Sequence, residues 1–173
     1  IIIPRHIDRL GSITNEFKKK NVSYILKTNY TFKDHDANFL IVDTFGELGV
    51  FFKLSQIAIV GGSFSKNGGH NPIETKDFNC SLIFGPHMHN FKEIKKDIIK
   101  YQAGFEAKNK DQLIEIISKL LKDRKLNLKT VNNFKKLCKL RSDESITAST
   151  IRDSLKSMNL GDVNVKNLVK KVI

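Results

Sequence analysis

The sequence predicts an α/β protein with a Rossmann-like, doubly wound parallel sheet. Two observations point to this fold class. Short apolar runs alternate with segments of helical periodicity, and clusters of glycine, charged and aromatic residues follow several of the apolar runs. The composition is that of a globular protein, because 40% of the 173 residues are hydrophobic and 28% are charged. A chain of this length can bury a substantial core.

The predicted elements follow one another as strand and helix along most of the chain. Strands are predicted at short apolar runs bounded by turn residues, at residues 1–3, 22–27, 39–42, 57–60, 81–84 and 104–107. Helices are predicted at residues 7–20, 47–54, 72–79, 91–101 and from 110 to 158. We therefore divide the chain into a Rossmann-like core at residues 1–109 and a helical extension of the same domain at residues 110–173. The apolar opening, without a methionine, is typical of the inside of a domain, so we expect a fragment of a longer protein.

The net charge of +12 comes mainly from one segment of the chain. Residues 92–141 carry 15 lysines and arginines against 6 acidic residues, whereas residues 1–91 carry 10 against 8. Three interpretations stay open: a solvated helix face, a surface that contacts anionic lipid head groups, or a nucleic-acid-binding surface. Nucleic acid is the least favoured, because few aromatic or arginine residues interleave these lysines, whereas base stacking would require more of them.

Cysteine content and hydropathy exclude several other classes of protein. Cys80 and Cys138 lie far apart without metal-like spacing, so we expect neither a disulfide framework nor a zinc site, and a reducing cytoplasmic compartment. Lys53 interrupts the longest apolar candidate, residues 48–60, which leaves no stretch of about 18 apolar residues for a membrane span. We predict neither a membrane span nor a signal peptide.

Unusual residues follow two predicted strands of the first third of the chain, at the carboxyl ends where open parallel sheets bind ligands. Arg5 follows the first strand, and its planar, permanently charged fork suits two phosphate oxygens. It could equally pair with Asp8 or Glu47 on the surface. The third strand is followed by Asp43-Thr44-Phe45-Gly46-Glu47, in which the Gly46 backbone would approach a flat base framed by Phe45 and Glu47. Helix capping by these residues is the structural alternative.

The strongest signal follows the fourth strand, where Gly61-Gly62-Ser63 precedes Gly68-Gly69-His70-Asn71-Pro72-Ile73-Glu74. Glycines permit close approach of a ligand, and a helix beginning at Pro72 would direct its amide groups at a phosphate. Glu74 would accept hydrogen bonds from the two hydroxyls of a ribose. The alternative is a glycine-rich turn with Asn71 as a helix cap. The spacing matches neither a Walker loop nor a dinucleotide-binding fingerprint.

Taken in order, these motifs resemble the C-terminal motifs of the bacterial 3-deoxy-D-manno-octulosonic acid (Kdo) transferases. The resemblance rests on Pro4-Arg5-His6, residues 42–49, residues 60–63, residues 68–74, and Phe84-Gly85-Pro86-His87 with Asn90-Phe91. It covers about residues 1–122, and the last third is similar only in being helical. A series of motifs in this order is far more specific than any one of them.

The resemblance implies the donor-binding, C-terminal half of a GT-B glycosyltransferase, with residues 1–109 as the nucleotide-sugar-binding core. The donor substrate implied by the resemblance is CMP-Kdo, and neither a cofactor nor a metal is expected. The donor-binding positions carried over from the family are Pro4, Arg5, Phe45, Gly46, Glu47, Asn71, Pro72, Ile73 and Glu74. The family's catalytic base is a glutamate of the N-terminal domain, which this chain lacks. No catalytic residue is therefore assigned here, and we expect the chain alone to be inactive.

The resemblance also implies the reaction and its place in the cell. The reaction is an inverting transfer of Kdo from CMP-Kdo to a lipid A precursor, in lipopolysaccharide biosynthesis. It would take place at the cytoplasmic face of the bacterial inner membrane, with the N-terminal domain as partner and an anionic membrane surface nearby.

One departure from the family pattern and two rival functions remain. The family usually continues Glu-Pro-Ala where this sequence has Glu74-Thr75-Lys76, and loss of the proline should barely disturb a helix, whereas Lys76 is a less neutral change. The first rival is another GT-B enzyme, either a transferase that uses UDP or GDP sugars or a nucleotide-sugar epimerase. The second rival is a non-enzymatic basic module that binds nucleic acid or membrane. The glycine motifs lie in the nearly charge-balanced half of the chain, which disfavours this second rival.

Overall fold

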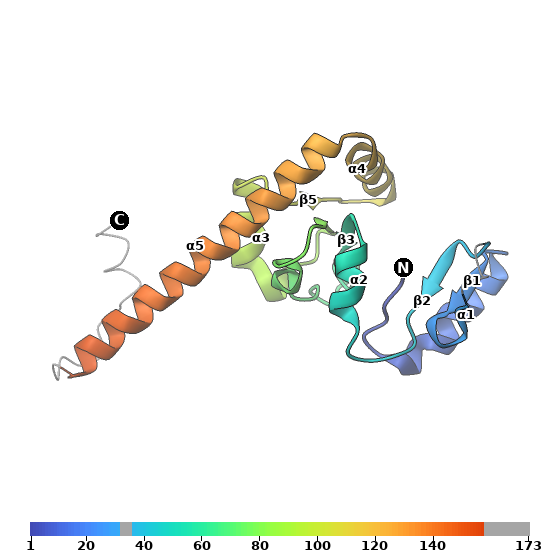
Figure 1. Cartoon of the computed structure of the whole chain (residues 1–173), viewed down its shortest axis with the longest axis horizontal. Coiled ribbons are helices and arrows are strands. Elements are labelled where there is room, and N and C mark those ends of the chain that lie inside the picture. The colour runs from blue at the N-terminus through green and yellow to red at the C-terminus, as the bar shows by residue number, and fades with distance from the viewer. Residues whose placement is uncertain (32–35, 158–173) are drawn as a thin grey trace. The chain divides into compact units, whose positions relative to one another are not determined.

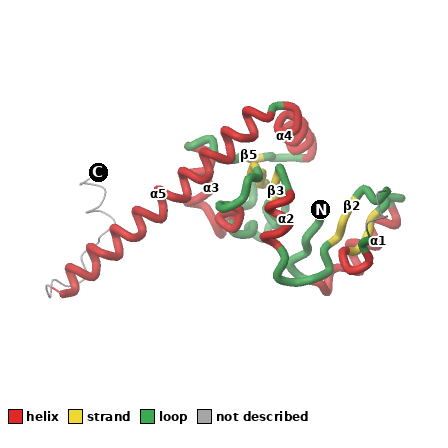
Figure 2. The backbone as a smooth tube through the Cα atoms, viewed as in Figure 1, coloured by secondary structure: helices red, strands yellow, loops and turns green. Residues whose placement is uncertain are grey.

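The computed structural model describes residues 1–31 and 36–157 (Figure 1, Figure 2). It divides into two compact units, a first unit at Ile1–Ser55 and a second unit at Gln56–Ile173. The division predicted between residues 109 and 110 stays a prediction. The end of the predicted helical extension, residues 158–173, lies outside the described residues.

The first unit is a small parallel sheet covered by one helix. Its elements are the 3-10 turn η1 (Ile7–Arg9), α1 (Leu10–Lys19), β1 (Tyr24–Leu26), the 3-10 turn η2 (Lys27–Asn29), β2 (Phe39–Ile41) and α2 (Leu48–Leu54). Strands β1 and β2 pair in parallel, with Tyr24 opposite Phe39. The Phe17 ring of α1 packs edge-on against both of these rings, with centroids 5.6 and 5.0 Å away. These aromatic contacts hold α1 on the sheet.

The predicted first strand forms only one parallel bridge, between Ile2 and Ile41. The Ile2 N–H donates to the Leu40 carbonyl and the Val42 N–H donates to the Ile2 carbonyl, both at 2.8 Å. This bridge places Pro4 and Arg5 directly after a chain segment that runs beside β2.

The second unit is a three-stranded parallel sheet in the order β3-β4-β5, with helices on both faces. Its elements are β3 (Ile57–Ile59), the 3-10 turn η3 (Pro72–Thr75), β4 (Ser81–Phe84), the 3-10 turn η4 (His89–Phe91), α3 (Lys92–Lys100), β5 (Phe105–Glu106), α4 (Lys110–Lys122) and α5 (Arg124–Ser157). The central strand β4 is buried at all four residues. Burial on both faces explains why its sequence is a continuous apolar run rather than an alternating one.

Adjacent residues of β4 point to opposite faces of the sheet, so the core of the second unit lies on both faces. On one face Ile83 packs with Ala107 and with Leu120 of α4. On the other face, Ile98 of α3 lies against Gly104, which directly precedes β5. Helix α4 begins at a reciprocal cap: the Gln112 N–H donates to the Asn109 side chain, and the Gln112 side chain accepts from the Lys108 N–H, both at 2.9 Å.

The predicted fold class is confirmed, because parallel strands alternate with helices in both units. The strand predicted at residues 81–84 has the same bounds in the structure. The helix predicted at residues 72–79 is wrong, because only the single 3-10 turn η3 forms there. The Thr75 hydroxyl donates to the Pro72 carbonyl at 2.9 Å, and the Lys76 N–H donates to the Ile73 carbonyl at 3.0 Å. These three-residue closures tighten the turn, and the chain then reaches β4 within a few residues.

Within residues 1–31 and 36–157, no helix carries an apolar stretch of the length that a membrane crossing requires. In the same part of the chain, Cys80 and Cys138 are free and buried, and burial raises the pKa of both thiols.

Candidate functional site

The turn at the carboxyl end of β2, Asp43–Glu47, is held at both ends by side-chain contacts. At its start, Asp43 accepts two hydrogen bonds from Thr28, one from the N–H at 3.0 Å and one from the hydroxyl at 2.5 Å. At its end, Glu47 accepts a hydrogen bond from the Thr44 hydroxyl and forms an ion pair with Lys27, whose Nζ lies 2.9 Å from Oε1. Each carboxylate is therefore held by two donors.

These contacts lower the pKa of both carboxyl groups. Partial burial alone would raise the pKa of Asp43, but the hydrogen bonds from Thr28 outweigh it. The hydrogen bonds from Thr44 and then from Lys27 lower the pKa of Glu47. Both carboxylates are stabilised in their charged form, so the turn is held by charge-assisted hydrogen bonds at neutral pH.

The tip of this turn is open. The side chain of Phe45 is 74% exposed, which is unusual for an aromatic residue next to a sheet. Gly46 has φ +84°, and no atom lies within 4 Å of the position that a Cβ would occupy. The left-handed backbone and the open space together leave the peptide groups at Gly46 accessible to a flat ligand.

Pro4 and Arg5 follow the Ile2 bridge, and Arg5 is exposed. Neither of the alternative ion pairs expected for Arg5 is present among the described residues, because Glu47 pairs with Lys27 and no ion pair involves Asp8. Within residues 1–31 and 36–157, no ion pair thus occupies the guanidinium of Arg5.

The glycine-rich segment of the second unit, residues 61–74, is held by backbone contacts. The His70 N–H donates to the Gly61 carbonyl at 3.1 Å, and the Gly69 N–H donates to the Gly62 carbonyl at 3.3 Å. Ser63 is fully buried: its hydroxyl donates to the Val60 carbonyl at 2.6 Å and accepts from the Gly85 N–H at 2.8 Å. Ser63 therefore ties the loop after β3 to the loop after β4.

Packing within the protein explains one of these glycines, Gly69, without a ligand. Gly69 has φ +74°, and a Cβ at this position would lie 2.2 Å from Sδ of Met88, whose side chain is buried. Only glycine satisfies both conditions, so Gly69 is explained by packing within the protein.

Asn71, Pro72, Ile73 and Glu74 form the turn that follows this segment. The Asn71 side chain accepts from the Ile73 N–H at 3.1 Å, which is the capping contact expected for it, and Pro72 is buried. Glu74 is exposed and has no hydrogen bond among the described residues. A single 3-10 turn has few aligned peptide dipoles, so the contribution of a helix N-terminus to anion binding is smaller than predicted. The open group here is the Glu74 carboxylate.

Seven of the nine predicted site residues thus form two clusters, one in each unit, while Pro4 and Arg5 lie in a separate segment of the first unit. Phe45, Gly46 and Glu47 share one turn of the first unit, and Asn71 to Glu74 share one turn of the second. Sequence reasoning missed Lys27 and Thr28, which lie in η2 at the carboxyl end of β1. The rule that strand ends carry ligand sites could have identified them, since they close a predicted strand.

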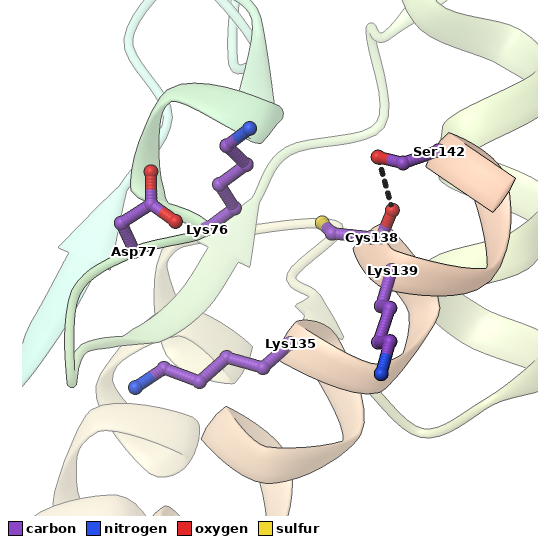
Figure 3. A pocket seen from close by; sticks show the side chains of 6 residues that line it. All are labelled: Lys76, Asp77, Lys135, Cys138, Lys139 and Ser142. Atoms are coloured by element: carbon purple, nitrogen blue, oxygen red, sulfur yellow. Dashed lines mark hydrogen bonds between the residues drawn. The ribbon is translucent and has the colours of Figure 1, made fainter. Parts of the chain in front are cut away.

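Lys76, one of the two residues that depart from the family pattern, lines a pocket of about 340 Å³ in the second unit. Lys76 and Asp77 follow η3, whereas Lys135, Cys138, Lys139 and Ser142 lie on α5 (Figure 3). Figure 3 shows the three lysine side chains extending in different directions, and the Lys135 ammonium donates to the Asn79 side chain at 2.8 Å. The ammonium groups do not converge on one anion. Among the described residues, no group of three or more His, Cys, Asp or Glu side chains could hold a metal ion.

Comparison with known proteins relates the chain to one set of enzymes. No family model matches it. The 3-deoxy-D-manno-octulosonic acid transferase of Rickettsia prowazekii is 39% identical over 131 residues, which are 75% of this chain and 28% of that protein. The enzyme of the same name from Aquifex aeolicus is 35% identical over 125 residues, which are 72% of this chain and 34% of that protein. A bifunctional glycosyltransferase/methyltransferase of Fusobacterium nucleatum is 31% identical over 173 residues, which are 98% of this chain and 24% of that protein.

The chain thus spans a quarter to a third of the length of these relatives. Among solved structures, the C-terminal CMP-Kdo binding domain of WaaA from Acinetobacter baumannii matches with a TM-score of 0.74 and 26% identity. The match covers 79% of this chain and 72% of that one. The predicted resemblance is confirmed by both sequence and structure.

Proposed function

We propose that this chain, which resembles the C-terminal CMP-Kdo binding domain of a Kdo transferase, is the donor-binding half of a GT-B glycosyltransferase. The observation that carries the proposal is the structural match to a domain whose described ligand is CMP-Kdo. The full protein would transfer Kdo from CMP-Kdo to a lipid A precursor during lipopolysaccharide biosynthesis, at the cytoplasmic face of the inner membrane. Its catalytic base would be supplied by an N-terminal domain.

The residues of this chain would bind the donor and stabilise its leaving group. The exposed Phe45 side chain and the open Gly46 backbone would contact the cytosine base. Glu74 would accept hydrogen bonds from the ribose hydroxyls. Arg5 would neutralise the CMP phosphate as the bond to the sugar breaks, while the base in the other domain removes the proton of the acceptor hydroxyl.

Replacing Glu74 tests the donor site. We expect Glu74→Ala to weaken CMP binding about tenfold to a hundredfold, because a hydrogen bond to a charged group contributes roughly 1.5–3 kcal/mol. The measurement is isothermal titration of the chain with CMP. The matched control is Glu115→Ala, which removes an exposed carboxylate of α4 and should leave the dissociation constant unchanged.

Two outcomes would contradict parts of this proposal. Equal CMP affinity in the wild type and Glu74→Ala would remove Glu74 from the ribose contact. Tighter binding of UMP or GDP than of CMP by the wild type would favour the rival GT-B enzymes that use UDP or GDP sugars.

A second part of the proposal concerns the membrane and the basic face of α3. Lys92, Lys96 and Lys100 are exposed at four-residue intervals, and the exposed Ile99 lies on the same face. Lysines beside an exposed apolar side chain suit an anionic lipid surface, at about 1 kcal/mol for each lysine. Lys95 is not part of this face. It is half-buried, forms an ion pair with Glu106 at 2.7 Å, and donates to the Pro86 carbonyl at 3.1 Å.

We expect the chain to co-sediment with anionic liposomes at low salt and to lose this binding as screening increases. Replacing Lys92, Lys96 and Lys100 with Gln should reduce the binding. The charge-matched control replaces Lys18, Lys19 and Lys20 with Gln. These lysines are exposed on the first unit, and the control should bind liposomes like the wild type. Absence of binding at low salt would leave these lysines as a solvated face, and tighter binding to short duplex DNA would favour the nucleic-acid alternative.

A further inference from the structure

Two consecutive residues of η2 hold the two ends of the Asp43–Glu47 turn. Thr28 donates twice to Asp43 at the start of the turn, and Lys27 pairs with Glu47 at its end. Because β1 and β2 are parallel neighbours, their carboxyl ends meet at one edge of the sheet, which brings η2 against the turn.

The backbone of the turn does not hold itself closed. Among the described residues, no backbone hydrogen bond joins any two residues of the stretch from Asp43 to Gly46. The first such bonds come after it, where Val50 and Phe51 donate to the Glu47 carbonyl at 3.0 and 3.4 Å. The shape of the turn therefore depends on side chains. Glu47 accepts a hydrogen bond from Thr44 within the turn and forms an ion pair with Lys27 of η2.

The held carboxylates are not the exposed part of the turn. The side chains of Lys27 and Glu47 are each about one-third exposed, at 35% and 34%, whereas Phe45 is 74% exposed. The contacts from η2 thus fix the base of the turn and leave its tip free. This arrangement suits a turn that presents Phe45 and Gly46 to a ligand.

We propose that Lys27 and Thr28 are positioning residues that hold the Phe45–Gly46 tip in the geometry that binds the nucleotide. This inference rests on the proposed function, since the nucleotide is the ligand assigned there. Lys27 and Thr28 act through Glu47 and Asp43, and the ligand contact itself is made by the tip.

The inference predicts that loss of either contact weakens nucleotide binding. Lys27→Gln removes the ion pair, and Thr28→Val removes the hydroxyl while keeping the shape of the side chain. Each should weaken CMP binding about threefold to thirtyfold, the range expected for coupled neighbours. Lys27→Arg keeps the charge and Thr28→Ser keeps the hydroxyl. Both variants should bind CMP within about twofold of the wild type. Dissociation constants from CMP titration and melting temperatures are measured for every variant.

A double-mutant cycle separates positioning from a general structural role. If Lys27 acts through Glu47, the losses of Lys27→Gln and Glu47→Gln are less than additive in the double variant, whereas independent effects add. If Lys27 has only a general structural role, Lys27→Gln lowers both the melting temperature and the CMP affinity. Lys27→Arg then keeps both at the wild-type level or lowers both.

Each outcome decides the proposal. Weakened binding with rescue, a coupled cycle and an unchanged melting temperature supports it. Unchanged CMP affinity in Lys27→Gln and Thr28→Val overturns the positioning role and leaves the proposed function standing. Losses of CMP affinity that only accompany losses of stability have the same consequence. If the wild-type chain does not bind CMP while Glu47 still responds to Lys27→Gln in a carboxyl titration, the donor site itself is wrong, and the positioning role falls with it.

Discussion

The two turns proposed to bind the donor are held in different ways. The Asp43–Glu47 turn is closed by charged and hydroxyl side chains and has an open tip. The glycine-rich segment at residues 61–74 is closed by backbone hydrogen bonds and by the buried Ser63, and Gly69 is packed against Met88. The first depends on electrostatics that respond to pH and to single polar substitutions. The second depends on steric fit.

This difference shows that similar glycines have different roles. Gly46 and Gly69 both have positive φ angles, at +84° and +74°. A side chain at Gly46 would enter open space, whereas one at Gly69 would collide with a buried methionine. Sequence alone treats both as residues that allow close approach of a ligand. The space beside Gly46 is open, whereas the space beside Gly69 is filled by Met88, so close approach of a ligand is proposed for Gly46 and not for Gly69.

The largest expected effect is the loss of stability on replacing Gly69. Gly69→Ala combines a left-handed backbone, which costs roughly 1–2 kcal/mol for a residue with a Cβ, and overpacking, which costs about 1–3 kcal/mol. We expect a loss of about 2–5 kcal/mol in the free energy of unfolding, measured by denaturant unfolding followed by circular dichroism.

Gly46→Ala is the matched control for this measurement. It has the same backbone cost and no steric contact, so it should lose about 1–2 kcal/mol. Equal losses in the two variants would mean that Met88 moves aside at no cost, and that packing does not hold the glycine-rich segment.

Much of the fold could be predicted from the sequence, because its signals are local. The run at residues 81–84 is apolar throughout since β4 is buried on both faces, and helical spacing identified α3 and α4. The helix predicted at residues 72–79 failed because Thr75 closes a three-residue turn, a choice that periodicity does not reveal.

The candidate site was predictable only in part, because its contacts join residues distant in sequence. Lys27 and Glu47 are 20 positions apart and meet only because β1 and β2 pair in parallel. Gly69 and Met88 meet across the loops that follow β3 and β4. Such contacts depend on strand order and register, which a single sequence does not specify. Strand ends could be located, but not the side chains that support them.

The smallest expected effect is a pH response of the Asp43–Glu47 turn. Because the pKa of Asp43 is below its ordinary value of 3.8, its contribution to stability is complete above that value and is lost as pH falls through the folded pKa. Thr28→Val removes one of the two donors, so the pKa of Asp43 should rise towards the ordinary value, while the remaining N–H bond keeps part of the shift. The pKa of Glu47 should change less, because hydrogen bonds from Thr44 and Lys27 are the main causes of its lowered value and the charge of Asp43 is a minor one. The measurement is a carbon-13 NMR titration of the side-chain carboxyl groups in both proteins.

A pKa of Asp43 that is the same in the two proteins would show that the Thr28 hydroxyl does not hold the start of the turn. The Lys27–Glu47 ion pair would then be the remaining side-chain contact from η2 that holds this turn. The difference between this turn and the glycine-rich segment would rest on that ion pair alone.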